Sequence, residues 1–256
     1  MTDSNPNDVA QPLVAHLKEL RDRLIRTIIV ILVIFAGLYY FANDLYVIVS
    51  KPLERLLPEN IADVGLIATG VTAPFLVPLK LTLVTAVFIA IPFILHQIWG
   101  FIAPALYKHE KKFAIPLLFS SVMLFYCGVA FAYFVVLPII FGFFAAISIE
   151  GIAYLPDISN VLDFILKIFF AFGIAFEIPI ATFLLVWAGI VELENLRKKR
   201  PYIIVGCFTV GMLVTPPDIF SQTILALPMW FLFEIGLLFS RFAIKAKVND
   251  TASAEN

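Results

Sequence analysis

Long apolar runs with one charged residue or none alternate with polar segments along the chain. The runs cover residues 27–43, 81–107, 113–149, 168–191, 201–217 and 219–240. We expect the second run to begin earlier, near Ala73, and the fourth to begin before Lys167. About 20 apolar residues are needed to cross a bilayer as a helix, so the pattern predicts a series of membrane-spanning helices. The third run is long enough for one helix or for two short ones.

The basic residues decide how many times the third run crosses. Most of the 18 Lys and Arg residues gather in four clusters, at 18–26, 108–112, 197–200 and 241–247. Positive clusters favour the cytoplasmic side of a membrane, so an even number of crossings must separate neighbouring clusters. The third run then crosses once, and its end after Pro138 either lies along the outer face or continues the helix.

The fold class predicted is an all-α polytopic membrane protein with six transmembrane helices and both termini in the cytoplasm. We expect a single domain over 1–245, with an amphipathic cytoplasmic segment at 8–24, a long external cap at 44–72, and a disordered tail at 246–256. Helices five and six are predicted to be short, which would thin the bilayer locally. The residues expected to build structural turns are Pro52, Pro104, Pro216, Pro217 and Asp218.

Composition supports a membrane protein and argues against an enzyme. Hydrophobic residues make up 61% of the chain and charged residues only 14%, whereas a soluble domain has about 25% charged residues. The two cysteines lie in apolar runs, where a disulfide is not expected. No hydrolase, nucleotide-binding or metal-ligand motif occurs. We therefore expect no catalytic residue, no metal, no cofactor and no nucleic-acid partner.

A few polar residues are expected at membrane depth. Glu177 lies in the run "FFAFGIAFEIPIATFLLVWAG" (169–189) and is followed by Pro179, which should bend the helix. A charged side chain at the bilayer centre costs about 2.5–3.5 kcal/mol on insertion scales. Glu177 could bond within its own bundle, act as a proton or ion relay, or be a polar docking point for a partner helix. Gln222 and Glu234 are candidates for the same partner-helix or intramembrane polar site.

Two cytoplasmic segments carry candidate binding residues. The loop "FIAPALYKHEKKF" (101–113) places Glu110 among three lysines, after a turn at Pro104. Glu110 either neutralises its neighbours or presents a carboxylate to a cationic ligand. In the amphipathic segment, Glu19 and Arg23 are spaced i,i+4. That segment is either an interfacial anchor leading into the first helix or part of a binding surface.

Several long motifs together resemble a known family. They are "HLKELRDRL" (16–24), "FIAPALYKHEKK" (101–112), "AFGIAFEIP" (171–179), "LRKKRPY" (196–202) and "VGMLVTPPDIFSQ" (210–222). In this order they resemble the TatC family, the large membrane subunit of the bacterial twin-arginine protein translocase. The resemblance covers the chain from about His16 to Arg241. It implies a cupped helical scaffold in the bacterial inner membrane, with the long external loop as a cap.

The resemblance also implies a function and a site. Family members are receptors for signal peptides that carry paired arginines, and the signal-recognition residues would be Glu110, Glu19, Phe101 and Arg23. A guanidinium offers a planar fork of donors that suits a carboxylate. The implied partners are TatA- and TatB-like single-span subunits, membrane lipid, and further copies of this chain within a hetero-complex driven by the proton-motive force.

A proton-coupled small-molecule transporter is the alternative function. Glu177, Lys80 and Glu234 support it, because transporters place ionisable residues at membrane depth. Transporters commonly contain paired repeats with broken helices at matching positions. The chain shows no such internal sequence repeat, which argues against this alternative.

Overall fold

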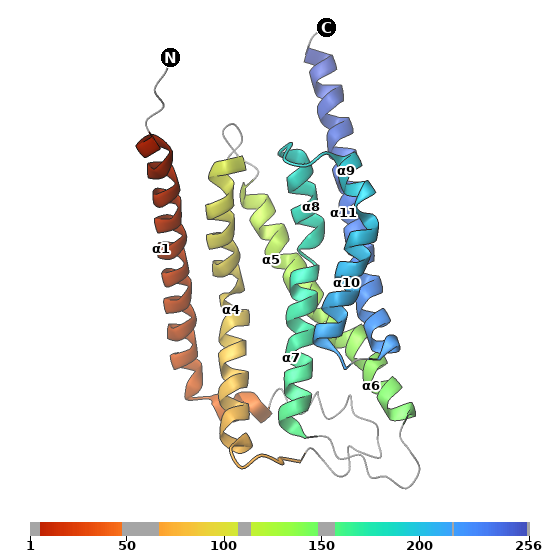
Figure 1. Ribbon diagram of the computed structural model, residues 1–256. Helices are drawn as coiled ribbons and strands as arrows, with labels where there is room; N and C mark the ends of the chain where they lie inside the picture. The colour runs from red at the N-terminus through yellow and green to blue at the C-terminus, as the bar shows by residue number, and fades with distance from the viewer. Residues whose placement is uncertain (1–5, 48–66, 107–113, 148–156, 217, 255–256) are drawn as a thin grey trace. The chain divides into compact units, whose positions relative to one another are not determined.

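The computed structural model describes residues 6–47, 67–106, 114–147, 157–216 and 218–254. Within these residues the named elements are all helical (Figure 1). They are α1 (Pro6–Tyr39), α4 (Ala73–Leu106), α5 (Ala114–Phe131), a π-helical turn (Ala132–Val136), α6 (Leu137–Ala146), α7 (Ile158–Ala175), α8 (Ile178–Trp187), α9 (Leu193–Lys198), α10 (Arg200–Val214) and α11 (Ile219–Ala254).

Each of the six predicted crossings corresponds to helix. Four segments are long and apolar enough to span a bilayer: Ala73–Phe101, Ile115–Phe144, Ile158–Trp187 and Ile219–Phe242. The shorter apolar helix α10 corresponds to the fifth predicted crossing. The first predicted crossing forms the C-terminal part of α1, which ends at Tyr39. The all-helical, multi-pass architecture predicted from the sequence is therefore confirmed.

The last two helices differ from each other in length. Helix α10 has 15 residues, which at 1.5 Å per residue give about 22 Å, less than the hydrocarbon core of a bilayer. Helix α11 has 36 residues and its apolar span alone has 24, so the prediction of a short sixth helix was wrong. The helix also continues through residues 246–254, which we expected to be disordered. Beyond the charged cluster, Ala252 and Ala254 are good helix formers.

Prolines account for two interruptions in the membrane helices. Pro138 has no N–H to donate to the carbonyl of Phe134, four residues earlier. The preceding turn is π-helical, and the N–H of Leu137 donates to the carbonyl of Ala132. The third run therefore continues as one interrupted helix, and it does not turn along the outer face.

The second interruption lies at Glu177. Helix α7 ends at Ala175 and α8 begins at Ile178. Pro179 cannot donate to the carbonyl of Ala175, and the N–H of Glu177 instead donates to Ile174 at 3.0 Å, the spacing of a 3₁₀ turn. Glu177 is thus half-buried at a break between two helices, and not in the middle of one continuous helix.

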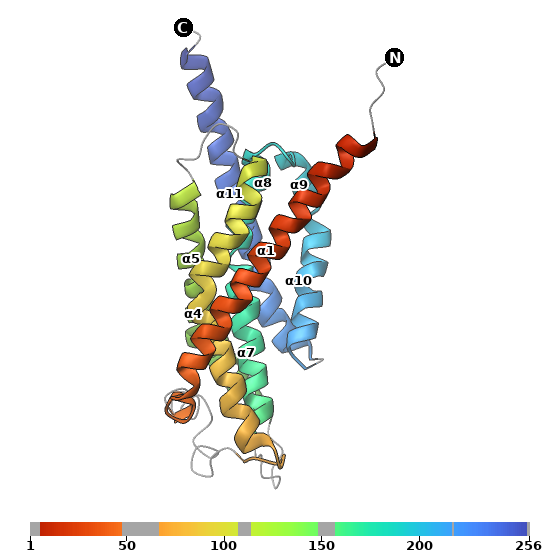
Figure 2. The same cartoon turned by 90° about the vertical axis from the view of Figure 1, so that its left-hand side faces the viewer.

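The helices form two compact units. Residues 1–47 and 78–122 form the first unit, and residues 48–77 and 123–256 form the second. The single domain predicted over 1–245 stays a prediction. In the first unit, α1 and α4 lie side by side in Figure 1 and cross in Figure 2. Within this unit Trp99 Nε1 donates to Ser121 Oγ at 3.1 Å, which links α4 to the start of α5.

The core of the second unit combines the π-helical turn, α6, α7 and α11. Its side chains include Leu137, Ile140, Ile165, Phe172 and Leu225, all almost completely buried. Small residues allow the helices of this unit to approach closely, as is common between membrane helices. A Cβ atom built on Gly128 of α5 would lie 2.5 Å from the carbonyl oxygen of Phe172 on α7.

Helix α11 packs along both α8 and α10 in this unit. A Cβ atom on Gly236 of α11 would lie 2.9 Å from Cα of Pro179, at the start of α8. An ion pair joins α10 to α11, with Arg200 Nη2 at 2.6 Å from Glu234 Oε2. The Glu234 side chain is 25% exposed. Packing and charge therefore both hold α11 to its neighbours.

Asp157 connects the start of α7 to residues 67–69 within the second unit. One carboxylate oxygen accepts from the N–H groups of Ser159 and Asn160, which caps the helix. The other accepts from the N–H of Thr69 at 2.8 Å and from its hydroxyl at 2.5 Å. The hydrogen bond from the Thr69 hydroxyl and that from its N–H lower the pKa of Asp157 from 3.8 to about 2.

Gly128→Ala should destabilise the protein. The added methyl group would meet a backbone carbonyl oxygen at 2.5 Å, and overpacking of this kind typically costs about 1–3 kcal/mol. Gly142→Ala on α6 is the matched control, because nothing lies within 4 Å of its Cβ position. We expect a lower melting temperature in detergent for Gly128→Ala only. Equal melting temperatures for the two variants would contradict the close contact between α5 and α7.

Asp157 should make a pH-dependent contribution to stability. Its pKa is lowered in the folded protein, so the contribution is present above about pH 4 and is lost as the pH falls toward 2. Asp157→Asn keeps a helix cap but removes the charge. The difference in melting temperature between the wild type and this variant should be constant at pH 5–7 and shrink below pH 4. A difference that does not change with pH would argue against this assignment.

Candidate functional site

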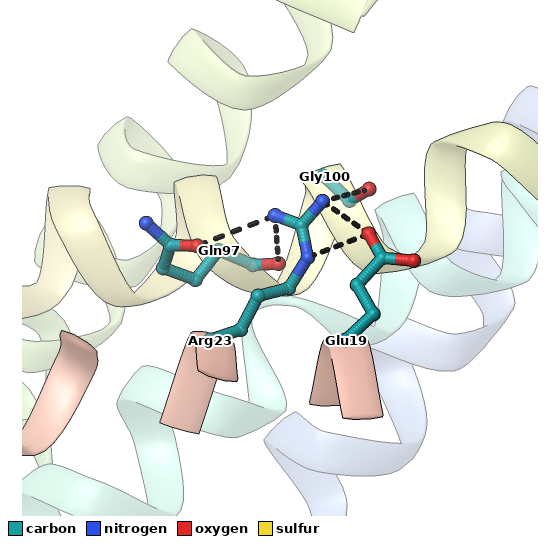
Figure 3. Close-up of polar contacts among 4 residues, drawn as sticks. All are labelled: Glu19, Arg23, Gln97 and Gly100. Carbon is teal, nitrogen blue, oxygen red and sulfur yellow. Dashed lines mark hydrogen bonds and ion pairs between the residues drawn. The ribbon is translucent and has the colours of Figure 1, made fainter. Parts of the chain in front are cut away.

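A face of α1 carries three of the chemically interesting residues of the first unit. His16, Glu19 and Arg23 follow one another at helical spacings of three and four residues, so they share a face. This face contacts Gln97 and Gly100 near the C-terminal end of α4 (Figure 3). The structure therefore brings the amphipathic segment and the end of the second crossing together at one site.

Arg23 is the centre of this site. Its Nε and Nη2 atoms donate to the same oxygen of Glu19, Oε1, at 3.0 and 2.6 Å. Nη2 also donates to the carbonyl of Gly100 at 2.9 Å. Nη1 donates to two atoms of Gln97: the side-chain oxygen Oε1 at 3.2 Å and the backbone carbonyl oxygen at 3.5 Å. A guanidinium has five N–H donors, and these five hydrogen bonds occupy them.

Pro104 helps to explain why the carbonyl of Gly100 is available to Arg23. Pro104 lies inside α4, which ends at Leu106, so our prediction that it builds a turn between helices was wrong. Proline is tolerated there because the Gly100 carbonyl, four residues earlier, loses its helical donor and accepts from the guanidinium instead. Pro104 therefore leaves a backbone carbonyl in the last turns of α4 that can accept a hydrogen bond from the side chain of another helix.

Phe101 and His16 form the aromatic part of the site. Their rings stack with centroids 4.2 Å apart and planes inclined by 18°. This contact lies beside Gly100 in the sequence of α4 and one helical turn before Glu19 on α1. Phe101, which we predicted as a site residue, thus packs against the same face of α1 as the predicted acid.

Glu19 presents a partly accessible carboxylate. Its side chain is 41% exposed, whereas that of Arg23 is 22% exposed. Figure 3 shows its second oxygen, Oε2, turned away from the guanidinium, and among the described residues this oxygen has no hydrogen bond. Glu19 also lines a pocket of about 380 Å³ on α1, together with Lys18, Asp22, Arg23 and Arg26. The pocket therefore mixes acids with cations.

Asp22 on the next face of α1 is bound to its own neighbour. Arg21 Nη2 and Nε donate to Asp22 Oδ1 at 2.7 and 3.0 Å. This hydrogen bond lowers the pKa of Asp22, helped by the charges of Arg21, Lys18 and Arg26. Asp22 is therefore ionised, and its partner Arg21 is largely exposed to solvent.

Three predicted residues lie outside the described residues. They are Glu110, Pro52 and Pro217. Pro216 and Asp218, the remaining turn predictions, lie between α10 and α11. There the N–H of Asp218 donates to the carbonyl of Pro216 at 2.7 Å, and Asp218 Oδ1 accepts from the N–H of Ser221 at 2.6 Å.

The predicted intramembrane polar residues do not form one cluster. Gln222 and Glu234 are twelve residues apart on α11, which corresponds to about 18 Å along the helix. The backbone of Gln222 lies against Gly211 of α10, and Glu234 pairs with Arg200. Glu177 is at the break between α7 and α8. Their role toward a partner helix stays a prediction.

Sequence reasoning missed two members of the α4 site, Gln97 and Gly100. Gln97 is 8% exposed and was a detectable signal, because it is an amide in an otherwise apolar run. The spacing of Gly100 and Pro104 was a second signal, since it marks the carbonyl without a helical donor. Within the described residues no group of three His, Cys, Asp or Glu side chains could hold a metal ion.

Comparison with known proteins identifies the family. The family model described as "Sec-independent protein translocase protein (TatC)" matches residues 15–228. The translocase protein TatC of Azotobacter chroococcum is 61% identical over 239 residues, which are 93% of this chain and 92% of that protein. TatC of Escherichia coli K12 is 55% identical over 234 residues, covering 91% of this chain and 90% of that protein.

A solved structure agrees with these sequence relatives. A crystal structure of the twin-arginine translocase receptor TatC superposes with a TM-score of 0.79 at 38% identity, covering 90% of this chain and 99% of that one. Members of this family are components of a protein translocase and are not enzymes. This assignment decides against the small-molecule transporter considered above. The chain is a multi-pass membrane protein of the TatC family of Sec-independent protein translocases.

Proposed function

We propose that this chain is the receptor and scaffold subunit of a twin-arginine translocase in the bacterial inner membrane. It binds the paired arginines of signal peptides on folded precursor proteins, and export is driven by the proton-motive force. The observation that carries the proposal is the Glu19 carboxylate, held by Arg23 beside Phe101 with one oxygen open. A similar solved protein is described as a translocase receptor, which supports the same reading.

Glu110 is the second and stronger acceptor in this proposal. It stands among Lys108, Lys111 and Lys112 in the sequence, so a generic basic peptide would be repelled there. A guanidinium that can form a bidentate pair with the carboxylate gains more than a point charge does. Two acids on separate segments would supply acceptors for two adjacent arginines.

The role proposed for Arg23 differs from that of the two acids. Its five N–H donors are all occupied within the first unit, and its charge would repel an incoming arginine. Arg23 therefore contributes to the site through Glu19 and not by a direct bond to the peptide. Phe101 is proposed to support the site from α4, where it stacks on His16.

The chain is also proposed to assemble with other membrane proteins. The partners are TatA- and TatB-like single-span subunits, with further copies of this chain in the same complex, surrounded by lipid. Polar side chains in apolar helices are suited to docking a partner helix. Glu177 at the α7–α8 break, with Gln222 and Glu234 on α11, are the residues proposed for these contacts.

Glu110→Ala should abolish binding of a twin-arginine peptide while the protein still inserts and folds. Each charge-assisted hydrogen bond contributes about 1.5–3 kcal/mol, so loss of a bidentate pair should weaken binding at least tenfold. Glu19→Ala should cost less, because Arg23 already neutralises much of its charge. Fluorescence anisotropy with a labelled signal peptide measures both. An unchanged affinity in Glu110→Ala would refute the assignment, and strict additivity in the double variant would argue against a shared site.

Glu177 can be tested separately from signal binding. Glu177→Gln keeps a hydrogen-bonding side chain of the same shape, and it should retain crosslinking to a single-span partner. Glu177→Ala should weaken that crosslinking, and Glu177→Lys should weaken it further. Peptide affinity should stay at the wild-type value in all three variants. If site-specific crosslinking is the same in all of them, Glu177 has no role in docking.

A further inference from the structure

The geometry of the ion pair between Glu19 and Arg23 is one-sided. An arginine and a carboxylate often pair as two forks, with each oxygen accepting one bond. Here Nε and Nη2 of Arg23 both donate to the single oxygen Oε1 of Glu19, at 3.0 and 2.6 Å. The second oxygen, Oε2, is turned away (Figure 3). The pair thus fixes the carboxylate without covering all of it.

Arg23 is itself fixed from the opposite side by α4. Its remaining N–H groups donate to the buried side chain of Gln97, to the Gln97 carbonyl and to the carbonyl of Gly100. The Gly100 carbonyl can take this role because Pro104 supplies no helical donor to it. Because Gly100 has no side chain, the guanidinium can lie close: a Cβ atom there would be 2.5 Å from Nη1.

We infer that Arg23 is a positioning residue for signal recognition: it holds the Glu19 carboxylate through Oε1 so that Oε2 faces a guanidinium of the bound signal peptide. This inference rests on the proposed function, in which Glu19 is an acceptor. It assigns Gln97, Gly100 and Pro104 to the same task, since they set the place and the plane of the Arg23 guanidinium.

The arrangement favours arginine over lysine in the peptide. Arg23 neutralises most of the charge of Glu19, so a second cation gains little from simple attraction. What remains is a hydrogen bond to an oxygen whose lone pairs point in fixed directions. A planar guanidinium with donors in a rigid fork fits such an acceptor better than a strongly hydrated ammonium group does. Releasing the Glu19 carboxylate from Arg23 should therefore reduce the selectivity for arginine over lysine in the peptide as well as the affinity for the peptide.

The test is a double-mutant cycle on the full-length protein in detergent. Labelled peptides carrying Arg-Arg or Lys-Lys are titrated into the wild type, Arg23→Lys, Glu19→Gln and the double variant. Arg23→Lys keeps the positive charge but removes the planar fork. We expect it to weaken binding of the Arg-Arg peptide roughly three- to tenfold in the presence of Glu19 and less than twofold in the Glu19→Gln background. Selectivity for Arg-Arg over Lys-Lys should fall with it.

Arg21→Lys is the matched control, because Arg21 is exposed and binds only Asp22 among the described residues. It should leave both affinities unchanged. Equal losses from Arg23→Lys with and without Glu19 would show that Arg23 only holds the two helices together, and the inference would be overturned while the proposed function stood. Tighter binding in Arg23→Lys would also overturn it, since Arg23 would then compete with the peptide. Wild-type affinity in Glu19→Gln would remove Glu19 from the proposed site, and this inference with it.

A second variant tests the position of Arg23 without changing any charge or side-chain donor. Gly100→Ala places a methyl group where the guanidinium lies, so it should displace Arg23 and lower peptide affinity in the same Glu19-dependent way. Gly37→Ala is its control, because nothing lies within 4 Å of that Cβ position on α1. If Gly100→Ala binds the Arg-Arg peptide as well as Gly37→Ala does, the guanidinium does not need its position, and the inference is wrong.

Discussion

A backbone carbonyl inside a lipid bilayer has no water to donate a hydrogen bond to it, so each one needs a donor from the protein. Proline removes such a donor from the helix in which it lies. The chain answers this constraint in a different way at three of its prolines: with a π-helical turn before Pro138, with a break in the helix before Pro179, and with the side chain of Arg23 before Pro104. Local hydrogen bonding of the backbone thereby shapes both the helices and the candidate site.

The π-helical turn, the helix break and the hydrogen bond from Arg23 differ in their effect on the surrounding structure. The π-helical turn and the break change the direction and register of side chains within the second unit, and the break leaves Glu177 between two helices. The carbonyl before Pro104 instead recruits a side chain from another helix, α1, and so joins the amphipathic segment to α4. Pro104, near the end of α4, therefore allows a side chain to link two helices of the first unit, whereas Pro138 and Pro179 alter the helices of the second unit themselves.

Much of the fold could be predicted from the sequence, because apolar length and the distribution of basic residues are strong signals. The start of the second crossing at Ala73 and the single crossing of residues 113–149 followed from these signals alone. The length of α11 did not, because a positive cluster such as Arg241–Lys247 marks the edge of the membrane and not the end of a helix. Pro104 was predicted to form a turn because a proline more often marks the end of a helix. Here it lies inside α4 and leaves the Gly100 carbonyl free to accept from a side chain.

The candidate site was predictable only in part. Glu19 and Arg23 could be placed together by their spacing, and Phe101 by its motif. Gln97 and Gly100 could not, because their contribution depends on how α1 lies against α4 and on which carbonyl Arg23 reaches. The pairing of Glu234 with Arg200 was missed for the same reason: 34 positions separate the two residues, and no local pattern connects them.

The length of α11 has a practical consequence for labelling this protein. At 1.5 Å per residue, 36 helical residues extend for about 54 Å, more than the 40–45 Å of a bilayer with its headgroups. The final turns must therefore project beyond the membrane surface, and a helix acts as a semi-rigid spacer. A fluorophore or affinity tag attached after Ala254 would be carried on this spacer, away from the lipid headgroups, and would report on the orientation of α11.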